Sequence, residues 1–212
     1  MSEETKRLLK YDLLCALKDI LIFVLIALGV QLWCHYMYKR MANMVFLADF
    51  AIGMPLFAWG GKDWLVQIRL YVSTGITRKR IFRVLIMRKL LVILAGIFIE
   101  AAMIFINYPE IGIKFMAVSG FFLLFVWGFG DIAGVLVYQR KKLGQIFLII
   151  GYMMIGMLSA GSFFSENQVG FWVVFLAEIT PETIAVIGVL AVAVFAGGIC
   201  FAKKQIRNYM VY

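Results

Sequence analysis

Long apolar runs, separated by short polar or charged stretches, dominate the sequence. Six of these runs are long enough to cross a hydrocarbon core of about 30 Å as helices. They cover about Ile20–Tyr38, Met44–Gly60, Val84–Ile106, Phe115–Tyr138, Leu143–Ala160 and Ile184–Ala202. The pattern predicts an all-α polytopic membrane protein in which residues 1–212 form one transmembrane domain with six transmembrane helices.

The stretch before the first run has the spacing of an amphipathic helix. Its apolar positions repeat at helical intervals, and its polar positions fill the opposite face. The apolar set is Leu9, Leu13, Ala16 and Leu17, and the polar set is Lys6, Arg7, Lys10, Asp12 and Lys18. We expect residues 1–19 to form an elbow helix in the membrane interface. The alternative is a plain cytosolic extension of the first span.

A second segment is too short and too acidic at its edges to span. Residues 161–182 have an apolar middle between Glu166 and Glu178. We expect a re-entrant or interfacial hairpin on the outer face, since the apolar part is shorter than a membrane crossing. Thr180 and Pro181 then predict the start of the last helix, with threonine as N-cap and proline at the first helical position.

The most basic stretch lies between the second and third runs, from Leu70 to Lys89. Gly75 suits the left-handed residue that ends a helix, and Thr77 suits the N-cap of the next one. We therefore expect a helix, a tight break and a short basic helix, with Ile81 and Phe82 as apolar anchors. Residues 70–83 would form the main surface open to a cytosolic partner.

Composition and charge support the membrane class and set an orientation. Hydrophobic residues make up 64% of the chain, whereas globular proteins contain about 45–50%. The net charge is +9, and all lysines and arginines except Lys39, Arg40 and Lys114 fall in segments on one side of the expected spans. The positive-inside rule places both termini in the cytosol. We expect a multi-pass protein of the bacterial inner or plasma membrane.

Catalytic and metal-binding motifs are missing. No phosphate-binding loop of the form G-x-x-x-x-G-K-[ST] is present, because Lys62 follows Gly61 without the upstream glycine. The three cysteines have no metal-ligand spacing, and the single His35 cannot build a metal site alone. We expect no enzyme activity, no bound metal and no cofactor in this chain.

Three acidic residues fall inside expected spans: Asp49, Glu100 and Asp131. Carboxylates at membrane depth are costly and usually face a bundle interior or a wet cavity. We consider them candidates for a substrate path, together with the aromatic residues Phe125 and Trp127. The alternatives are pairing or packing. Because no lysine or arginine is expected near mid-depth, full salt bridges look unfavourable. Gly130 and Gly134 allow close helix approach beside Asp131.

The layout and the central motif resemble the permeases of type-2 ATP-binding-cassette (ABC) transporters. The local match is S-T-G-I-T-R-K-R-I-F, and the layout match covers nearly the whole chain. The resemblance implies a coupling segment that docks on an ABC ATPase. It comprises Gly75, Ile76, Thr77, Arg78, Lys79, Arg80, Ile81, Phe82 and Arg83. It also implies two ATPase copies, which bind ATP and Mg, and a second permease copy or a related permease. The outer segment is too short for a large substrate-gating cap.

The favoured function is that of a transmembrane permease subunit of an ABC exporter, working by alternating access. Its substrate would be lipophilic or amphipathic, such as a peptide, a drug or a lipid-linked molecule, so that antimicrobial peptide or drug efflux is one possible role. Two alternatives remain open: the substrate-binding membrane subunit of an energy-coupling-factor vitamin importer, and a non-transporting membrane scaffold. Nucleic acid is not an expected partner.

Overall fold

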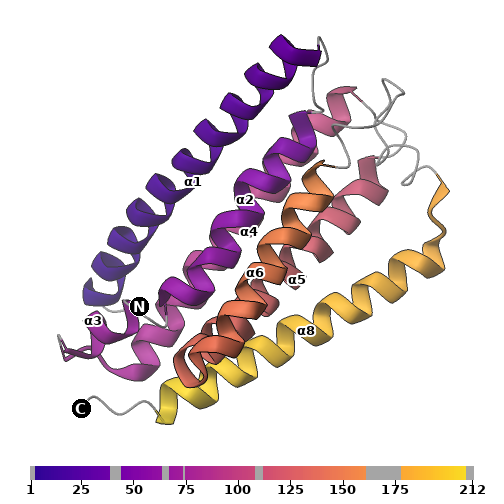
Figure 1. The fold of residues 1–212 in the computed structure, drawn as a ribbon. Coiled ribbons are helices and arrows are strands. Elements are labelled where there is room, and N and C mark those ends of the chain that lie inside the picture. The colour runs from indigo at the N-terminus through magenta and orange to yellow at the C-terminus, as the bar shows by residue number, and fades with distance from the viewer. Residues whose placement is uncertain are drawn as a thin grey trace.

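The computed structural model describes residues 3–38, 44–63, 67–73, 75–107, 112–160 and 178–208. The described chain forms a bundle of long helices (Figure 1). In chain order these are α1 (Glu3–Tyr38), α2 (Met44–Lys62), α3 (Ile68–Ser73), α4 (Arg78–Asn107), α5 (Gly112–Gln139), α6 (Lys141–Ala160) and α8 (Pro181–Asn208). The start of α1, the end of α8 and the short helix α3 lie at the same end of the bundle (Figure 1). The expected all-helical class is confirmed.

The prediction of six transmembrane helices is wrong. Only two of the described helices are long and apolar enough to cross a membrane, Ile113–Gln139 in α5 and Pro181–Arg207 in α8. In α2 the apolar stretch is shorter, from Ala51 to Gly60. Two other long helices carry charges within their length: Asp12 lies in α1, and Arg88 and Lys89 lie in α4. The third expected run, Val84–Ile106, includes Arg88 and Lys89, which make this helix less apolar than a membrane span.

Helix α1 also corrects the elbow prediction, because it continues without a break from Glu3 to Tyr38. The face that packs inward differs from the expected one. Leu9 and Ala16 are buried in the bundle and do not face the membrane interface, Asp12 between them is also buried, and Leu17 is 63% exposed. The N-terminal helix therefore belongs to the bundle and brings a carboxylate into its interior.

The turn at Gly75 has the predicted local geometry. Gly75 has a φ of 79°, in the left-handed region that favours glycine. Its N–H donates to the Val72 carbonyl, and the Ile76 N–H donates to the Tyr71 carbonyl, both at 3.1 Å. This pair of bonds is a Schellman motif, which satisfies the last carbonyls of a helix. The expected separate basic helix is absent from the described residues, because α4 begins at Arg78 and runs on to Asn107.

The start of α8 confirms that Thr180 is the N-cap of the last helix. The Thr183 N–H donates to the Thr180 hydroxyl oxygen at 3.3 Å, and the Ile184 N–H donates to the Thr180 carbonyl at 3.1 Å. Pro181 takes the first helical position. The predicted re-entrant hairpin at 161–182 lies outside the described residues over most of its length.

Two hydrophobic clusters hold the bundle together. The larger one joins α1, α2, α4, α5 and α6 around residues such as Phe57 and Leu123. The smaller one lies toward the end that holds α3 and includes Tyr71, Ile81 and Ile206. Burying a large apolar side chain stabilises a fold by about 1.5–3 kcal/mol. The two clusters bracket a set of buried charges.

Glycines bring α5 very close to its neighbours. A Cβ atom on Gly198 of α8 would lie 2.5 Å from the Gly128 carbonyl oxygen of α5. A Cβ atom on Gly130 would lie 2.9 Å from the Phe57 carbonyl oxygen of α2. Such contacts are below the ordinary van der Waals distance, so only glycine fits. The close approach predicted for Gly130 is confirmed.

Large apolar side chains remain exposed on the outer faces of α1, α6 and α8. Leu32, Met153 and Val189 are examples, at 70%, 58% and 70% exposure. Soluble monomers rarely expose continuous apolar surface on this scale. These faces and the two long apolar helices fit association with a membrane.

Candidate functional site

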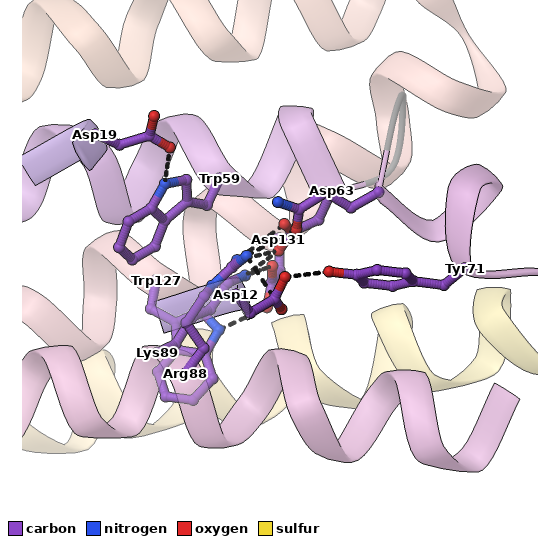
Figure 2. A network of polar contacts seen from close by, with 10 residues as sticks. Asp12, Asp19, Trp59, Asp63, Tyr71, Arg88, Lys89, Trp127 and Asp131 are labelled. Atoms are coloured by element: carbon purple, nitrogen blue, oxygen red, sulfur yellow. Dashed lines mark hydrogen bonds and ion pairs between the residues drawn. The ribbon is translucent and has the colours of Figure 1, made fainter. Parts of the chain in front are cut away.

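A cluster of buried charged residues lies inside the bundle, where α1, α2, α3, α4 and α5 meet (Figure 2). Its charged members are Asp12, Asp63, Arg88, Lys89 and Asp131, and each is less than a tenth exposed. Buried ions lose their hydration and are retained only when partners compensate them. The geometry of each pair therefore shows what the cluster can do.

Arg88 is the centre of one half of the cluster. Its Nη2 donates to both carboxylate oxygens of Asp63 at 2.8 Å, and its Nη1 donates to the Gln67 side-chain oxygen at 2.7 Å. The planar guanidinium suits such forked contacts. Because Asp63 follows α2 and Gln67 precedes α3, Arg88 ties the end of α2 and the start of α3 to α4.

Asp12 links α1 to the same arginine. Its carboxylate accepts a hydrogen bond from the Tyr71 hydroxyl of α3 and lies 3.7 Å from the Arg88 guanidinium. Burial and the neighbouring Asp12 carboxylate raise the pKa of Tyr71 above its ordinary value. Tyr71 therefore remains a neutral hydrogen-bond donor well into the alkaline range.

Lys89 forms the other half with Asp131. The Lys89 ammonium donates to one oxygen of Asp131, and the Trp127 indole N–H donates to the other at 2.7 Å. Lys89 also lies 3.4 Å from Asp63. One lysine thus stands between two carboxylates, one after α2 and one on α5 (Figure 2).

Two tryptophans enclose the cations. The Arg88 guanidinium carbon lies 4.7 Å from the ring centroid of Trp59, and the Lys89 nitrogen lies 5.7 Å from that of Trp127. Cation–π contacts of this kind strengthen when water is excluded. The Trp59 indole N–H donates to Asp19 at 2.8 Å. The aromatic rings therefore replace part of the hydration that the buried cations lose.

A small cavity adjoins the Lys89 half of the cluster. Its volume is about 20 Å³, and its polar lining comes from Asp63, Lys89 and Asp131. The rest of the lining is mainly apolar side chains of α4 and α8. A cavity of this size holds one water molecule when two or more polar groups face it.

The expectation that Asp131 forms no full salt bridge is wrong, because Lys89 pairs with it. Salt bridges looked unfavourable because Arg88 and Lys89 were placed at the inner end of a span. Since α4 begins at Arg78, both residues lie about three helical turns inside the bundle, and Lys89 reaches Asp131. Asp12 and Asp63 were missed as members of the site. The adjacent Arg88 and Lys89 within an apolar helix were the signal that could have revealed it.

Of the other candidate path residues, only Trp127 is placed beside Asp131 by a described contact. The side chains of Asp49 and Glu100 lie outside the described residues. Phe125 is half-buried and stacks on Phe129 with 5.8 Å between ring centroids. Trp127 does belong to the site, as the hydrogen-bond donor to Asp131. Among the described residues, no group of three or more side chains could hold a metal ion.

The proposed coupling segment is only partly accessible. Ile81 is fully buried in the chain's own smaller hydrophobic cluster, so the expectation that it inserts into a partner is wrong. Phe82 is half-buried and lines the cavity. Thr77, Arg78, Lys79 and Arg83 are exposed. Arg78 also donates to the Arg207 carbonyl at 2.7 Å, which joins this turn to the end of α8.

Comparisons with protein-family models, curated proteins and solved structures give no match. No family can be assigned on that basis. The described geometry defines a helical protein with membrane-compatible surfaces and a buried ion cluster.

Proposed function

We propose that this chain is a membrane-embedded transport subunit, the permease of an ABC exporter, and that a separate chain supplies the ATPase. The observation that carries the proposal is the concentration of exposed basic side chains at one end of the bundle. They come from four separate parts of the chain. These are Lys6, Arg7 and Lys10; Arg78, Lys79 and Arg83; Arg140, Lys141 and Lys142; and Lys203, Lys204 and Arg207.

The helix directions bring these four parts together. The start of α1, the α3–α4 turn, the α5–α6 junction and the end of α8 all lie at the same end of the bundle (Figure 1). Positive charge next to membrane-spanning helices favours the cytosolic side. In this proposal the basic end faces the cytosol, both termini lie there, and the apolar faces contact lipid.

The Gly75 turn is the best-formed docking feature of the basic end. The Schellman bonds and the buried Ile81 fix its backbone, while Lys79 and Arg83 point away from the core as exposed cations. A rigid turn with a basic rim suits an acidic groove, because little conformational entropy is lost on binding. The partner surface would therefore be acidic, and the contact would weaken with salt.

The buried cluster gives the turn a connection to the candidate span α5. Tyr71 lies in the helix that the turn ends, and it bonds Asp12, which faces Arg88. The neighbouring Lys89 bonds Asp131 of α5. A displacement of α3 by a bound ATPase would act on these contacts. The cargo in this proposal is a lipophilic or amphipathic molecule, as the resemblance implies.

Purification from membranes of the natural host tests the proposal. The tagged chain is solubilised gently, and the co-purified chains are identified by mass spectrometry and assayed for ATP hydrolysis. We expect an ABC ATPase in the wild-type sample. A Lys79→Glu/Arg83→Glu variant should retain roughly a tenth or less of it, which corresponds to about 1.4 kcal/mol of binding free energy.

Lys141→Glu/Lys142→Glu is the matched control, because it makes the same charge change at the same end of the bundle. We expect this control to retain more ATPase than the turn variant. Equal loss in both would show that only the overall charge matters. A wild-type sample without any ATPase would contradict the proposed function.

A further inference from the structure

The two cations of the buried cluster differ in chemistry and in surroundings. Arg88 has a guanidinium that stays protonated in proteins, and it does not line the cavity. Lys89 has a compact ammonium on a flexible stem, which can change its ion-pair partner, and it does line the cavity beside Asp131. The Arg88–Asp63 pair is therefore a permanent clamp, whereas the Lys89–Asp131 pair has access to a site for water.

The cavity walls lead from Lys89 toward the basic end. On α4, Phe82, Ile86 and Lys89 line it at helical spacing, so they share one face. On α8, Ile199, Ala202 and Ile206 do the same. Phe82 lies one turn into α4 and Ile206 lies in the last turn of α8. The cavity thus lies between the ion pair and the end of the bundle where α4 begins.

Lys89 has two carboxylates within reach. It donates to Asp131, and Asp63 lies 3.4 Å away. If Asp131 takes a proton, the ammonium keeps a charged partner by shifting toward Asp63. A buried cation without a counter-charge would be costly. Protonation of Asp131 avoids this cost, because Lys89 then pairs with Asp63.

We propose that Asp131 and Lys89 form a proton-binding site that exchanges with solvent through a water molecule in this cavity. The water takes up a proton from solvent and passes one to a carboxylate oxygen of Asp131, so that it remains a neutral water, and the Lys89 ammonium moves its ion pair to Asp63. Release reverses both steps. No other bond forms or breaks. The site does not depend on an ATPase partner and would operate in the isolated chain.

The groups that face this pair come from each neighbouring helix. Asp63 approaches after α2, Arg88 lies next in α4, and Trp127 donates from α5. Asp12 of α1 and Tyr71 of α3 act through Arg88. The described lining from α8 is apolar. Acidification therefore acts on a carboxylate whose cation can change partner, and the Tyr71 hydroxyl stays protonated throughout.

Infrared spectroscopy of the purified protein in lipid tests the proposal. The spectrum at mildly acidic pH minus that at neutral pH should show the C=O band of one protonated carboxylic acid. The band should shift quickly when the buffer is exchanged for D₂O. It should be lost in Asp131→Asn, a variant that keeps the side-chain shape and cannot take the proton.

Variants that fill the cavity test whether the proton exchanges through it. Ala202→Leu should keep the band but slow its shift in D₂O, since water is excluded, and Ile199→Phe is a second filling variant if the first does not fold. Ala193→Leu adds the same volume to an exposed position of the same helix and should exchange like the wild type. Circular dichroism checks that each variant is folded.

Two results would overturn the proposal. One is a wild-type spectrum without an acid-induced band that depends on Asp131. The other is a filled variant in which the band shifts as fast as in the wild type. Either result would leave the Lys89–Asp131 pair as a structural salt bridge that does not exchange protons with the cavity.

Discussion

Lys89 of α4 and Asp131 of α5 form an ion pair inside the bundle, although they stand 42 positions apart in the chain. This contact ties a candidate membrane span to a helix that is interrupted by charge. Removing one partner of a buried pair leaves the other charge uncompensated, at a cost of about 3–5 kcal/mol.

The first prediction follows from this pair. Lys89→Met should lower the free energy of unfolding by about 3–5 kcal/mol. The double variant Lys89→Met/Asp131→Leu should recover most of that loss, because no charge is then orphaned. Thermal or denaturant unfolding in a fixed detergent measures both. A double variant as unstable as the single one would show that Asp131 has another indispensable role.

We expect the contribution of Tyr71 to the free energy of unfolding to depend on pH in the alkaline range. The folded state raises its pKa above the ordinary value of about 10, so the neutral form stabilises the fold. This contribution is complete below pH ~10 and is lost as the pH rises above it, since the unfolded chain then releases the proton first. Tyr71→Phe removes the hydroxyl donor to Asp12 and should cost about 1–3 kcal/mol at neutral pH.

The measurement compares the two proteins at neutral pH and above pH ~10. The difference in unfolding free energy between wild type and Tyr71→Phe should shrink in the alkaline buffer. Other titrating groups are common to both and cancel. A difference that stays constant or grows with pH would contradict the assigned hydrogen bond.

Features decided by residues adjacent in the chain could be predicted from the sequence, whereas contacts between distant residues could not. The caps at Gly75 and Thr180 were predicted correctly, because each is decided by a few adjacent residues. The helical class was also correct, since apolar periodicity is a local signal. The burial of Asp12 was not predicted, because its spacing with Lys6 and Lys10 also fits a solvated face.

The site itself depends on where helices begin and on which helices meet. Arg88 was expected at the edge of a span because α4 was taken to start near Val84, and its true start at Arg78 moves the charge inward. Ile81 was interpreted as an exposed anchor for the same reason. Among the described residues, Asp63 joins the cluster through Arg88 and Lys89 of α4, and one-dimensional patterns carry no sign of such pairings.

Two glycine substitutions should have opposite effects. Gly75→Ala places a side chain at positive φ and should destabilise by about 1–2 kcal/mol, although the position has open space around it. Gly197→Ala, within α8 and also in open space, should stabilise by about 0.5–1 kcal/mol because alanine favours a helix. Unfolding midpoints measure both. Equal signs would refute the assigned role of the Gly75 turn.

Orientation in the membrane can be tested with single cysteines. The chain is first freed of Cys15, Cys34 and Cys200, and one cysteine is then placed at Glu182 or Lys204, at opposite ends of α8. In intact cells, a membrane-impermeant thiol reagent should label Glu182→Cys and not Lys204→Cys. Labelling of both after the cells are opened controls for access, and the reverse pattern would contradict a cytosolic basic end.

The mass of the native complex tests the proposed function most directly. The chain is expressed at its natural level, extracted gently from host membranes and measured intact by native mass spectrometry. We predict a complex with two ATPase copies and two permease chains, either identical or related. A complex that loses the ATPase on raising the salt would fit the basic contact. A chain that always appears alone, without an ATP-hydrolysing partner, would contradict the account.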